Sequence, residues 1–306
     1  MRAIGPADGA DGADGADGAD GADGANGARG GGTGDSPLIR PIGVSPAIHT
    51  RPGEDWFRGN KWPPADLAAR FTDVAAATFP RWGWSAFHYS IVALGEFVRV
   101  TVPFAWDQIA LPAVPAGAAL TTELDELEEL IDYRAGVMSE ALAQRNNISV
   151  YWAGLLMFNK ASHPATYRLA QIALRIAQFQ AMHYKYNTQT PGRPRPSQIR
   201  LSLMPPIDVP GHASYPSGHA TEAYLLAGVL ANVMPAAAST PTTAGDQEST
   251  PLRRLAERVA RNREVLGLHY RSDSEAGKYL ADQSLTLLIR CQSYIDLQPV
   301  AYGEWH

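Results

Sequence analysis

Cysteine is almost absent from this sequence: Cys291 is the single thiol among 306 residues. One thiol can form neither an internal disulfide nor a cysteine-based zinc site, so the fold must be stabilised by other means. The histidines show no H-E-x-x-H pattern or comparable metal spacing. The sequence therefore offers no support for a zinc or di-iron enzyme.

Long apolar segments are also missing. The longest near-apolar stretch, residues 223–238, is interrupted by Asn232 and Pro235, and it is shorter than the roughly 20 apolar residues that span a bilayer. The N-terminal segment Met1–Pro6 lacks the apolar core of a signal peptide. We therefore expect a soluble protein with no membrane insertion, and a cytoplasmic location by default.

An excess of positive charge is missing as well. The chain contains 26 Lys+Arg and 31 Asp+Glu, which gives a net charge of −5. Residues 1–36 contain seven aspartates and two arginines, so this segment accounts for the whole excess, and residues 37–306 contain 24 charges of each sign. A balanced domain lacks the basic footprint of a nucleic-acid-binding protein. We expect no nucleic-acid partner.

Residues 1–36 form a low-complexity tail. Glycine occupies every third position from Gly9 to Gly30, mostly as Ala-Asp-Gly. A collagen triple helix also needs abundant proline, and this stretch contains none after Pro6. A disordered, self-repelling acidic tail is the interpretation we favour. The alternative is that the tail is an assembly or interaction module attached to an inactive helical scaffold.

Residues 37–306 are predicted to form one all-α domain, because strand-like alternation is absent and helical periodicity recurs. The predicted helices span residues 66–79, 122–144, 148–160, 164–186, 219–234, 251–267 and 274–297. Thr250 as N-cap and Pro251 in the first turn favour the start of the sixth helix. Residues 236–249, rich in Ala, Ser, Thr and Gly, are expected to form a mobile loop. The acidic residues within 123–129 are interpreted as a solvated helix face.

Three short stretches contain the residues suited to chemistry. In order, they supply Lys185 with Arg193, then Ser217, Gly218 and His219, and then Arg263, His269 and Asp273. The N–H groups at a helix N-terminus bind anions, and glycine lets the backbone approach closely. Arginine forks and a lysine charge hold tetrahedral oxyanions. His269 and Asp273 are four residues apart, so the carboxylate can fix the imidazole tautomer, and His219 adds an acid–base group. The stretches predict an oxyanion-binding site.

This pattern resembles the PAP2 superfamily, which joins type 2 phosphatidic acid phosphatases, bacterial acid phosphatases and vanadium-dependent haloperoxidases. The family motifs are K-x6-RP, PSGH and SR-x5-H-x3-D. The second motif matches fully at residues 216–219, and the third matches in spacing. Two positions depart, because seven residues separate Lys185 from Arg193 and Asn262 replaces the motif serine. The resemblance covers about residues 185–273 and implies a helical bundle of the acid phosphatase/vanadium-dependent haloperoxidase type.

The resemblance implies two related chemistries for one pocket. In the phosphatases, the residue matching His269 attacks phosphorus and forms a phosphohistidine, while His219 would protonate the leaving group and Asp273 would orient His269. In the haloperoxidases, the same pocket holds vanadate with the residue matching His269 as its axial metal ligand, and peroxide oxidises a halide. In both cases the oxyanion would be held by Lys185, Arg193, Ser217, Gly218 and Arg263.

His212 leans toward the haloperoxidase branch. It lies seven residues before His219, at a position where bromoperoxidases carry histidine, although an exposed loop histidine is the alternative interpretation. The expected function is therefore a vanadium-dependent haloperoxidase-like enzyme with vanadate as cofactor and with halide and hydrogen peroxide as substrates. The alternative is a soluble phosphatase that hydrolyses phosphomonoesters without a cofactor. The sequence is compatible with a homo-oligomer.

Overall fold

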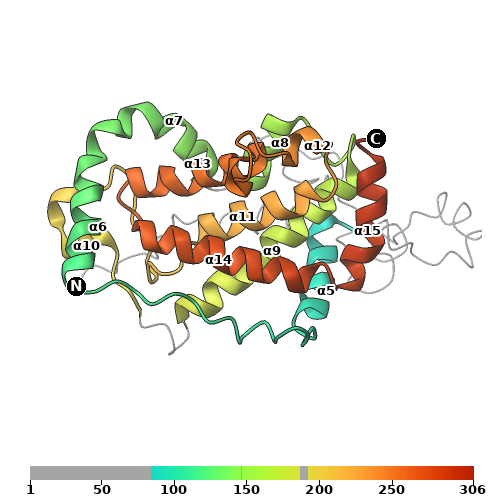
Figure 1. The fold of residues 1–306 in the computed structure, drawn as a ribbon, viewed down its shortest axis with the longest axis horizontal. Helices are drawn as coiled ribbons and strands as arrows, with labels where there is room; N and C mark the ends of the chain where they lie inside the picture. The colour runs from blue at the N-terminus through green and yellow to red at the C-terminus, as the bar shows by residue number, and fades with distance from the viewer. Residues whose placement is uncertain (1–83, 146, 187–191) are drawn as a thin grey trace, which may run out of the picture. The chain divides into compact units, whose positions relative to one another are not determined.

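The computed structural model describes residues 84–145, 147–186 and 192–306. Within these ranges the chain forms helices and no β-strand, so the predicted all-α fold is confirmed (Figure 1). Residues from Ala86 onward belong to one compact unit. The predicted tail of residues 1–36 and the helix predicted over residues 66–79 lie outside the described residues.

The helices of this unit vary widely in length, from single turns to more than twenty residues. Their bounds are α5 (Ala86–Phe97), α6 (Ala118–Glu129), η4 (Ile131–Tyr133), α7 (Arg134–Arg145), α8 (Ile148–Leu156), α9 (Pro164–Tyr186), α10 (Pro196–Ile199), η5 (Leu201–Leu203), α11 (Gly218–Ala231), α12 (Ala236–Ser239), η6 (Gln247–Ser249), α13 (Pro251–Val265), α14 (Arg271–Leu288) and α15 (Gln292–Gly303), where η marks 3₁₀ helices. Helices α8 and α9 begin at the predicted residues, and Thr250 caps α13 by accepting a hydrogen bond from Arg253 N at 3.3 Å.

Helix α11 lies at the centre of the bundle, in contact with α9, α13 and α14 (Figure 1). Its sequence is apolar on every side, as expected for a helix that neighbours surround, and nearly all of its residues are buried. Small residues such as Ala220 and Ala223 allow close packing. Because the Ser-Gly-His motif begins this helix, the motif is anchored in the protein core.

Helix α14 approaches the start of α11 at a glycine. A Cβ atom on Gly277 would lie 2.6 Å from the backbone oxygen of Ser217 and 2.9 Å from Cβ of Ala220. Neither of these atoms can move without moving α11, because both belong to its first turn or its cap. Gly277 therefore sets the distance between the two helices at the motif.

Replacing Gly277 with alanine should lower the free energy of unfolding by about 1–3 kcal/mol, because the added methyl group overpacks two backbones. Gly228→Ala is a matched control in α11. A Cβ there would lie 2.6 Å from Cδ2 of Leu285, the flexible end of a side chain that can rotate away. Urea unfolding of both variants tests the contrast, and equal losses would contradict the assigned role of Gly277.

The prediction of one continuous helix over residues 122–144 is wrong, because the structure contains three separate elements there, α6, η4 and α7. The reason is a tertiary anchor at the break. Arg134 Nε donates to Val265 O at 3.0 Å, and its two Nη atoms donate to Met204 O and Leu203 O at 3.0 and 2.6 Å. These contacts attach the start of α7 to η5 and to the end of α13. Helical periodicity within residues 122–144 cannot reveal contacts with such distant residues.

The helix predicted over residues 274–297 is likewise divided into α14 and α15. A carboxylate from α5 stabilises the break, since Glu96 Oε2 accepts from Ser293 N at 2.7 Å in the first turn of α15. Residues 236–249, expected to be a mobile loop, contain α12 and η6. Within this segment Ser249 closes a compact turn, with its Oγ donating to Asp246 O at 2.7 Å.

Candidate functional site

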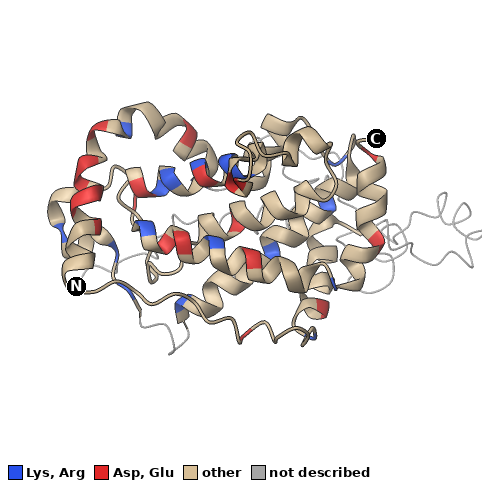
Figure 2. Cartoon of the chain, viewed as in Figure 1, with Lys and Arg blue, Asp and Glu red and all other residues tan. Residues whose placement is uncertain are grey.

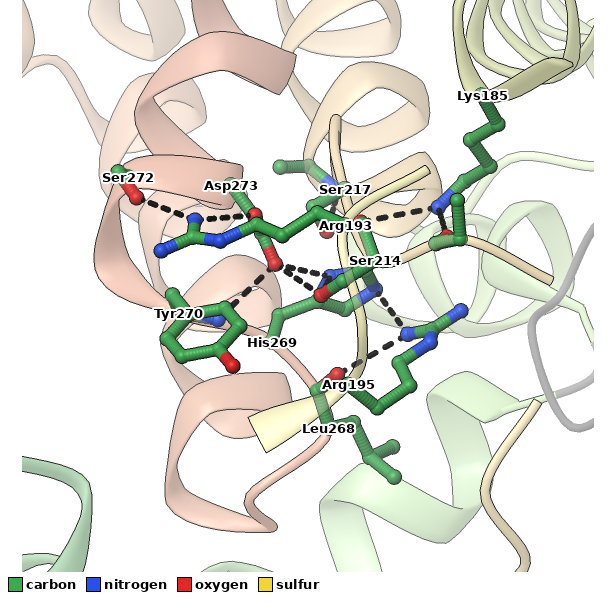
Figure 3. A network of polar contacts seen from close by, with 12 residues as sticks. Lys185, Arg193, Arg195, Ser214, Ser217, Leu268, His269, Tyr270, Ser272 and Asp273 are labelled. Atoms are coloured by element: carbon green, nitrogen blue, oxygen red, sulfur yellow. Dashed lines mark hydrogen bonds and ion pairs between the residues drawn. The ribbon is translucent and has the colours of Figure 1, made fainter. Parts of the chain in front are cut away.

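His269 and Asp273 form a buried pair where the loop after α13 enters α14. Both side chains are fully buried, and His269 Nδ1 lies 3.1 Å from Asp273 Oδ2. An ionised carboxylate only accepts hydrogen bonds, so Nδ1 carries the proton and Nε2 is the basic nitrogen. Ser214 Oγ and Tyr270 N also donate to Asp273 Oδ2, the latter at 3.1 Å. Three donors on one oxygen hold the carboxylate in a single orientation (Figure 3).

The pKa of Asp273 is held low despite complete burial. Burial by itself raises this pKa, but the hydrogen bond from His269, electrostatic attraction from His269 and Arg193, and the hydrogen bond from Ser214 together lower it from 3.8 to about 2. The folded protein therefore binds this proton less readily than the unfolded chain. The resulting stabilisation is complete above about pH 4 and is lost as the pH falls toward 2.

Asp273→Asn should show this pH dependence directly. Near pH 5 the variant should be less stable than the wild type by a few kcal/mol, because the ionised carboxylate is gone while Arg193 stays buried. The difference in free energy of unfolding should shrink between about pH 4 and pH 2, where the wild type loses its contribution. Urea unfolding at several pH values measures it. As a control, Asp296→Asn on the exposed side of α15 should show the same pH dependence of stability as the wild type. If Asp273→Asn were less stable than the wild type by the same amount at every pH, the assigned role of Asp273 ionisation would be contradicted.

Arg195 lies at the basic nitrogen of His269. Its Nη1 donates to His269 Nε2 at 3.0 Å and to Leu268 O at 3.0 Å, and the side chain is almost fully buried. Its Nε donates to His212 O at 3.1 Å, and its Nη2 lies 3.2 Å from His212 Nδ1. His212, which is half-buried, is thus joined to His269 through this guanidinium. Sequence reasoning missed Arg195, and the one available signal was the second Arg-Pro dipeptide of residues 193–196.

Arg193 occupies a different position from the one expected of an oxyanion ligand. Its Nη1 donates to Asp273 Oδ1 at 2.8 Å and to Ser272 Oγ at 2.6 Å, and its Nη2 donates to Glu123 Oε2 at 2.6 Å. The guanidinium carbon lies 3.6 Å from the centre of the Tyr270 ring. Arg193 therefore binds the carboxylate behind His269, while Arg195 contacts the imidazole in front.

Glu123 was interpreted from the sequence as part of a solvated face, and that interpretation is wrong for this residue. Its side chain is 11 % exposed and paired with Arg193. Asp125 and Glu128, on the same helix, agree better with the expectation, with 61 % and 39 % exposure, and both pair with Arg200. Helical spacing could not separate Glu123 from its neighbours, because its partner is 70 residues away.

Lys185 and the start of α11 lie beside this cluster. Lys185 is buried near the end of α9, and its Nζ donates to Ala213 O at 2.7 Å and to Ser214 O at 3.1 Å. Ser217 caps α11, and its backbone N–H donates to Asp273 O at 3.0 Å. A Cβ on Gly218 would meet no atom within 4 Å, so there is open space beside the first residue of α11.

His219 and Arg263 contact a different element. His219 Nε2 lies 3.2 Å from Gln144 O, and Arg263 Nη2 donates to Ala141 O, both in the last turns of α7. A carbonyl only accepts, so His219 Nε2 carries a proton in this arrangement. Asn262, at the motif serine position, donates from Nδ2 to Gln144 Oε1 at 3.0 Å. These contacts attach the start of α11 and the end of α13 to α7.

The structure brings most of the predicted residues together. Hydrogen bonds connect the His269–Asp273 pair with Arg193, Ser217 and Lys185, directly or through Ser214 (Figure 3). His212 joins the same network through Arg195. Gly218 adjoins Ser217, whereas His219 and Arg263 have their hydrogen bonds with α7 described above. The arrangement combines a buried imidazole with a defined tautomer, the cations Lys185 and Arg195, and the N-terminus of α11. Such a set can hold a tetrahedral oxyanion and expose it to a basic nitrogen.

A comparison with solved structures finds a bacterial vanadium-dependent iodoperoxidase. The match has a TM-score of 0.46 and 19 % sequence identity, and it covers 61 % of this chain. It spans about half, 53 %, of the iodoperoxidase chain. No protein-family model and no curated protein matches the sequence. Among the described residues, no helix is both long and apolar enough to cross a membrane.

Proposed function

We propose that this protein is an oxyanion-binding enzyme of the vanadium-dependent haloperoxidase type, in which His269 Nε2 is the nitrogen that meets the oxyanion. The observation that carries the proposal is the alignment Asp273–His269–Arg195. A carboxylate fixes the proton on Nδ1, and a guanidinium lies 3.0 Å from Nε2. An oxyanion attached to Nε2 would take over the hydrogen bond that Arg195 Nη1 gives to that nitrogen.

The residues around Nε2 fit vanadate. Lys185 and Arg195 supply positive charge, the first turn of α11 supplies backbone N–H groups, and open space adjoins Gly218. Vanadate and phosphate share charge and tetrahedral shape, so this donor set suits both. Bound vanadate would supply the activation of peroxide by which a halide is oxidised. The protein would hold the oxyanion, fix the proton of His269 on Nδ1 and exclude bulk water.

The proposed roles differ from the family pattern at three residues. Arg195 replaces Arg193 as the arginine that contacts the oxyanion, because Arg193 is held between two carboxylates. His212 would orient Arg195. For His219, a proton-donating role requires the hydrogen bond to Gln144 O to open, or requires Nδ1 to be the donor. The proposed ligands remain Lys185, Ser217, Gly218 and Arg263 together with Arg195.

Reconstitution with vanadate tests the proposal. Purified protein incubated with vanadate should brominate a dimedone-type acceptor when bromide and hydrogen peroxide are added, and it should retain vanadium after gel filtration. Omitting vanadate or peroxide should reduce turnover to background. Absence of bromination and of iodide oxidation by vanadium-loaded protein would contradict the haloperoxidase assignment.

The second candidate is a phosphatase that acts through a phosphohistidine. It is favoured by the Asp273–His269 pair itself, since a fixed Nδ1 proton leaves Nε2 as an in-line nucleophile for phosphorus. The expected result is hydrolysis of an aryl phosphate, with vanadate as a competitive inhibitor and with phosphate trapped on His269 after acid-free quenching. Bromination without any aryl phosphate turnover would reject this candidate.

A further inference from the structure

A buried chain of opposite charges joins α6 to the first turn of α14. Glu123 Oε2 accepts from Arg193 Nη2 at 2.6 Å, and Arg193 Nη1 donates to Asp273 Oδ1 at 2.8 Å. The three side chains are 11 %, 4 % and 0 % exposed in that order. The acidic residues of α6 are visible in Figure 2, and Arg193 lies over Tyr270 in Figure 3. Charges that are this deeply buried and this well paired act as one unit.

The same two residues also hold the backbone of that turn. Glu123 Oε1 accepts from Ser272 N at 2.7 Å, which satisfies one of the N–H groups at the start of α14. Arg193 Nη1 donates to Ser272 Oγ at 2.6 Å, and the guanidinium stacks on the ring of Tyr270. The pair therefore fixes the segment that lies between His269 and Asp273.

Asp273 divides its two oxygens between opposite neighbours. Oδ1 faces Arg193 and Oδ2 faces His269. If Arg193 had no second carboxylate, Asp273 alone would neutralise it, and the attraction would draw the carboxylate away from the imidazole. Glu123 balances Arg193 from the other side. Asp273 can then keep both Oδ2 and its negative charge directed at His269 Nδ1.

We propose that Glu123 and Arg193 are positioning residues for His269, acting through Asp273 without touching the oxyanion. This inference rests on the proposed function, since it takes His269 as the reactive group. It assigns to the first arginine of the Arg-Pro-Arg-Pro segment a task separate from that of Arg195. Breaking the pair should impair the chemistry at His269 and leave the affinity for the oxyanion nearly unchanged.

Glu123→Gln is the variant that tests the pair. Glutamine retains an oxygen that can accept from Ser272 N, but its amide then presents a donor to Arg193 Nη2, which also donates. Glu128→Gln is the matched control. It makes the same chemical change on the same helix, at a carboxylate that is 39 % exposed and pairs with Arg200 instead of Arg193.

Two measurements separate positioning from a general structural role. The first is a comparison of kcat with the dissociation constant of inorganic vanadate, for whichever of the two proposed reactions the wild type catalyses. Glu123→Gln should lower kcat by about 10–100-fold, as loss of an outer partner does at comparable sites, with the dissociation constant within about twofold of wild type. Glu128→Gln should match the wild type in both.

The second measurement does not depend on turnover. The downfield proton resonance of His269 Nδ1–H, identified by its loss in His269→Ala, reports the hydrogen bond to Asp273. In Glu123→Gln it should shift upfield and broaden through faster exchange with water, and in Glu128→Gln it should be unchanged. A wild-type resonance and a wild-type kcat in Glu123→Gln would overturn the inference, because the pair would then only join two helices.

Arg193→Lys keeps the experiment decisive if Glu123→Gln folds poorly. Lysine retains a charge between the two carboxylates but has no planar fork that reaches both, so the same loss of kcat and the same change in the resonance are expected. An intact resonance in Arg193→Lys would also overturn the inference. If the wild type catalyses neither reaction, the proposed function fails, while the resonance comparison still decides whether the pair positions His269.

Discussion

Replacing His269 with alanine should lower kcat by at least about 10³-fold in either proposed reaction, because the nitrogen that meets the oxyanion is removed and only electrostatic stabilisation remains. Retention of vanadium after gel filtration should be lost as well. The two measurements are steady-state turnover and the vanadium content of the purified protein.

The fold of His269→Ala should survive, which makes the result interpretable. Asp273 would keep the hydrogen bonds from Arg193, Ser214 Oγ and Tyr270 N, so its charge would stay compensated. Circular dichroism should match that of the wild type. His306→Ala, at the exposed C-terminus, should retain full activity. Turnover and vanadium content unchanged in His269→Ala would remove the site assignment altogether.

Arg195→Lys should strongly weaken the binding of the oxyanion. The guanidinium donates to His269 Nε2, and it would donate to an oxyanion bound at that nitrogen instead. Charge-assisted hydrogen bonds of this kind contribute about 1.5–3 kcal/mol each. Lysine keeps the charge but not the fork that reaches His269, Leu268 O and His212 together. The dissociation constant for inorganic vanadate should rise by roughly 10–100-fold, measured by titration calorimetry.

Arg193→Lys is the natural comparison for this affinity measurement. The substitution is chemically identical and lies two residues away, in the same Arg-Pro-Arg-Pro segment. Because Arg193 faces Asp273 and Glu123, its replacement should leave the dissociation constant within about twofold of wild type, as expected for a residue that contacts no ligand. The reverse outcome, with affinity lost in Arg193→Lys and kept in Arg195→Lys, would restore Arg193 as the oxyanion ligand.

The roles of the two arginines illustrate the limit of motif reading. Both precede a proline, and both satisfy the dipeptide that the motif requires. Arg195 has φ −67° and ψ 151°, a polyproline-like conformation in which three residues make one turn. Side chains two residues apart then point in different directions. Which of them faces His269 depends on how the loop is placed against α14, and spacing contains no information about that.

Short-range signals account for the parts of the fold that were predicted well. The N-cap at Thr250, the proline at the start of α9 and the period of the apolar residues act within one or two helical turns. The breaks before α7 and α15 were missed because Arg134 and Glu96 stabilise them through partners 69 to 197 residues away. Long-range contacts of this kind decide where a continuous periodic segment bends.

The all-α class and the pairing of His269 with Asp273 could be predicted from the sequence, because helical periodicity and the four-residue spacing of these two residues act over short range. The three-dimensional arrangement was needed to show which arginine meets His269, that Glu123 is buried behind Asp273, and that His219 and Arg263 contact α7. The two kinds of signal act over different distances along the sequence. Helical periodicity and capping are local, whereas the direction of a buried charge is set by whichever distant partner offsets its desolvation.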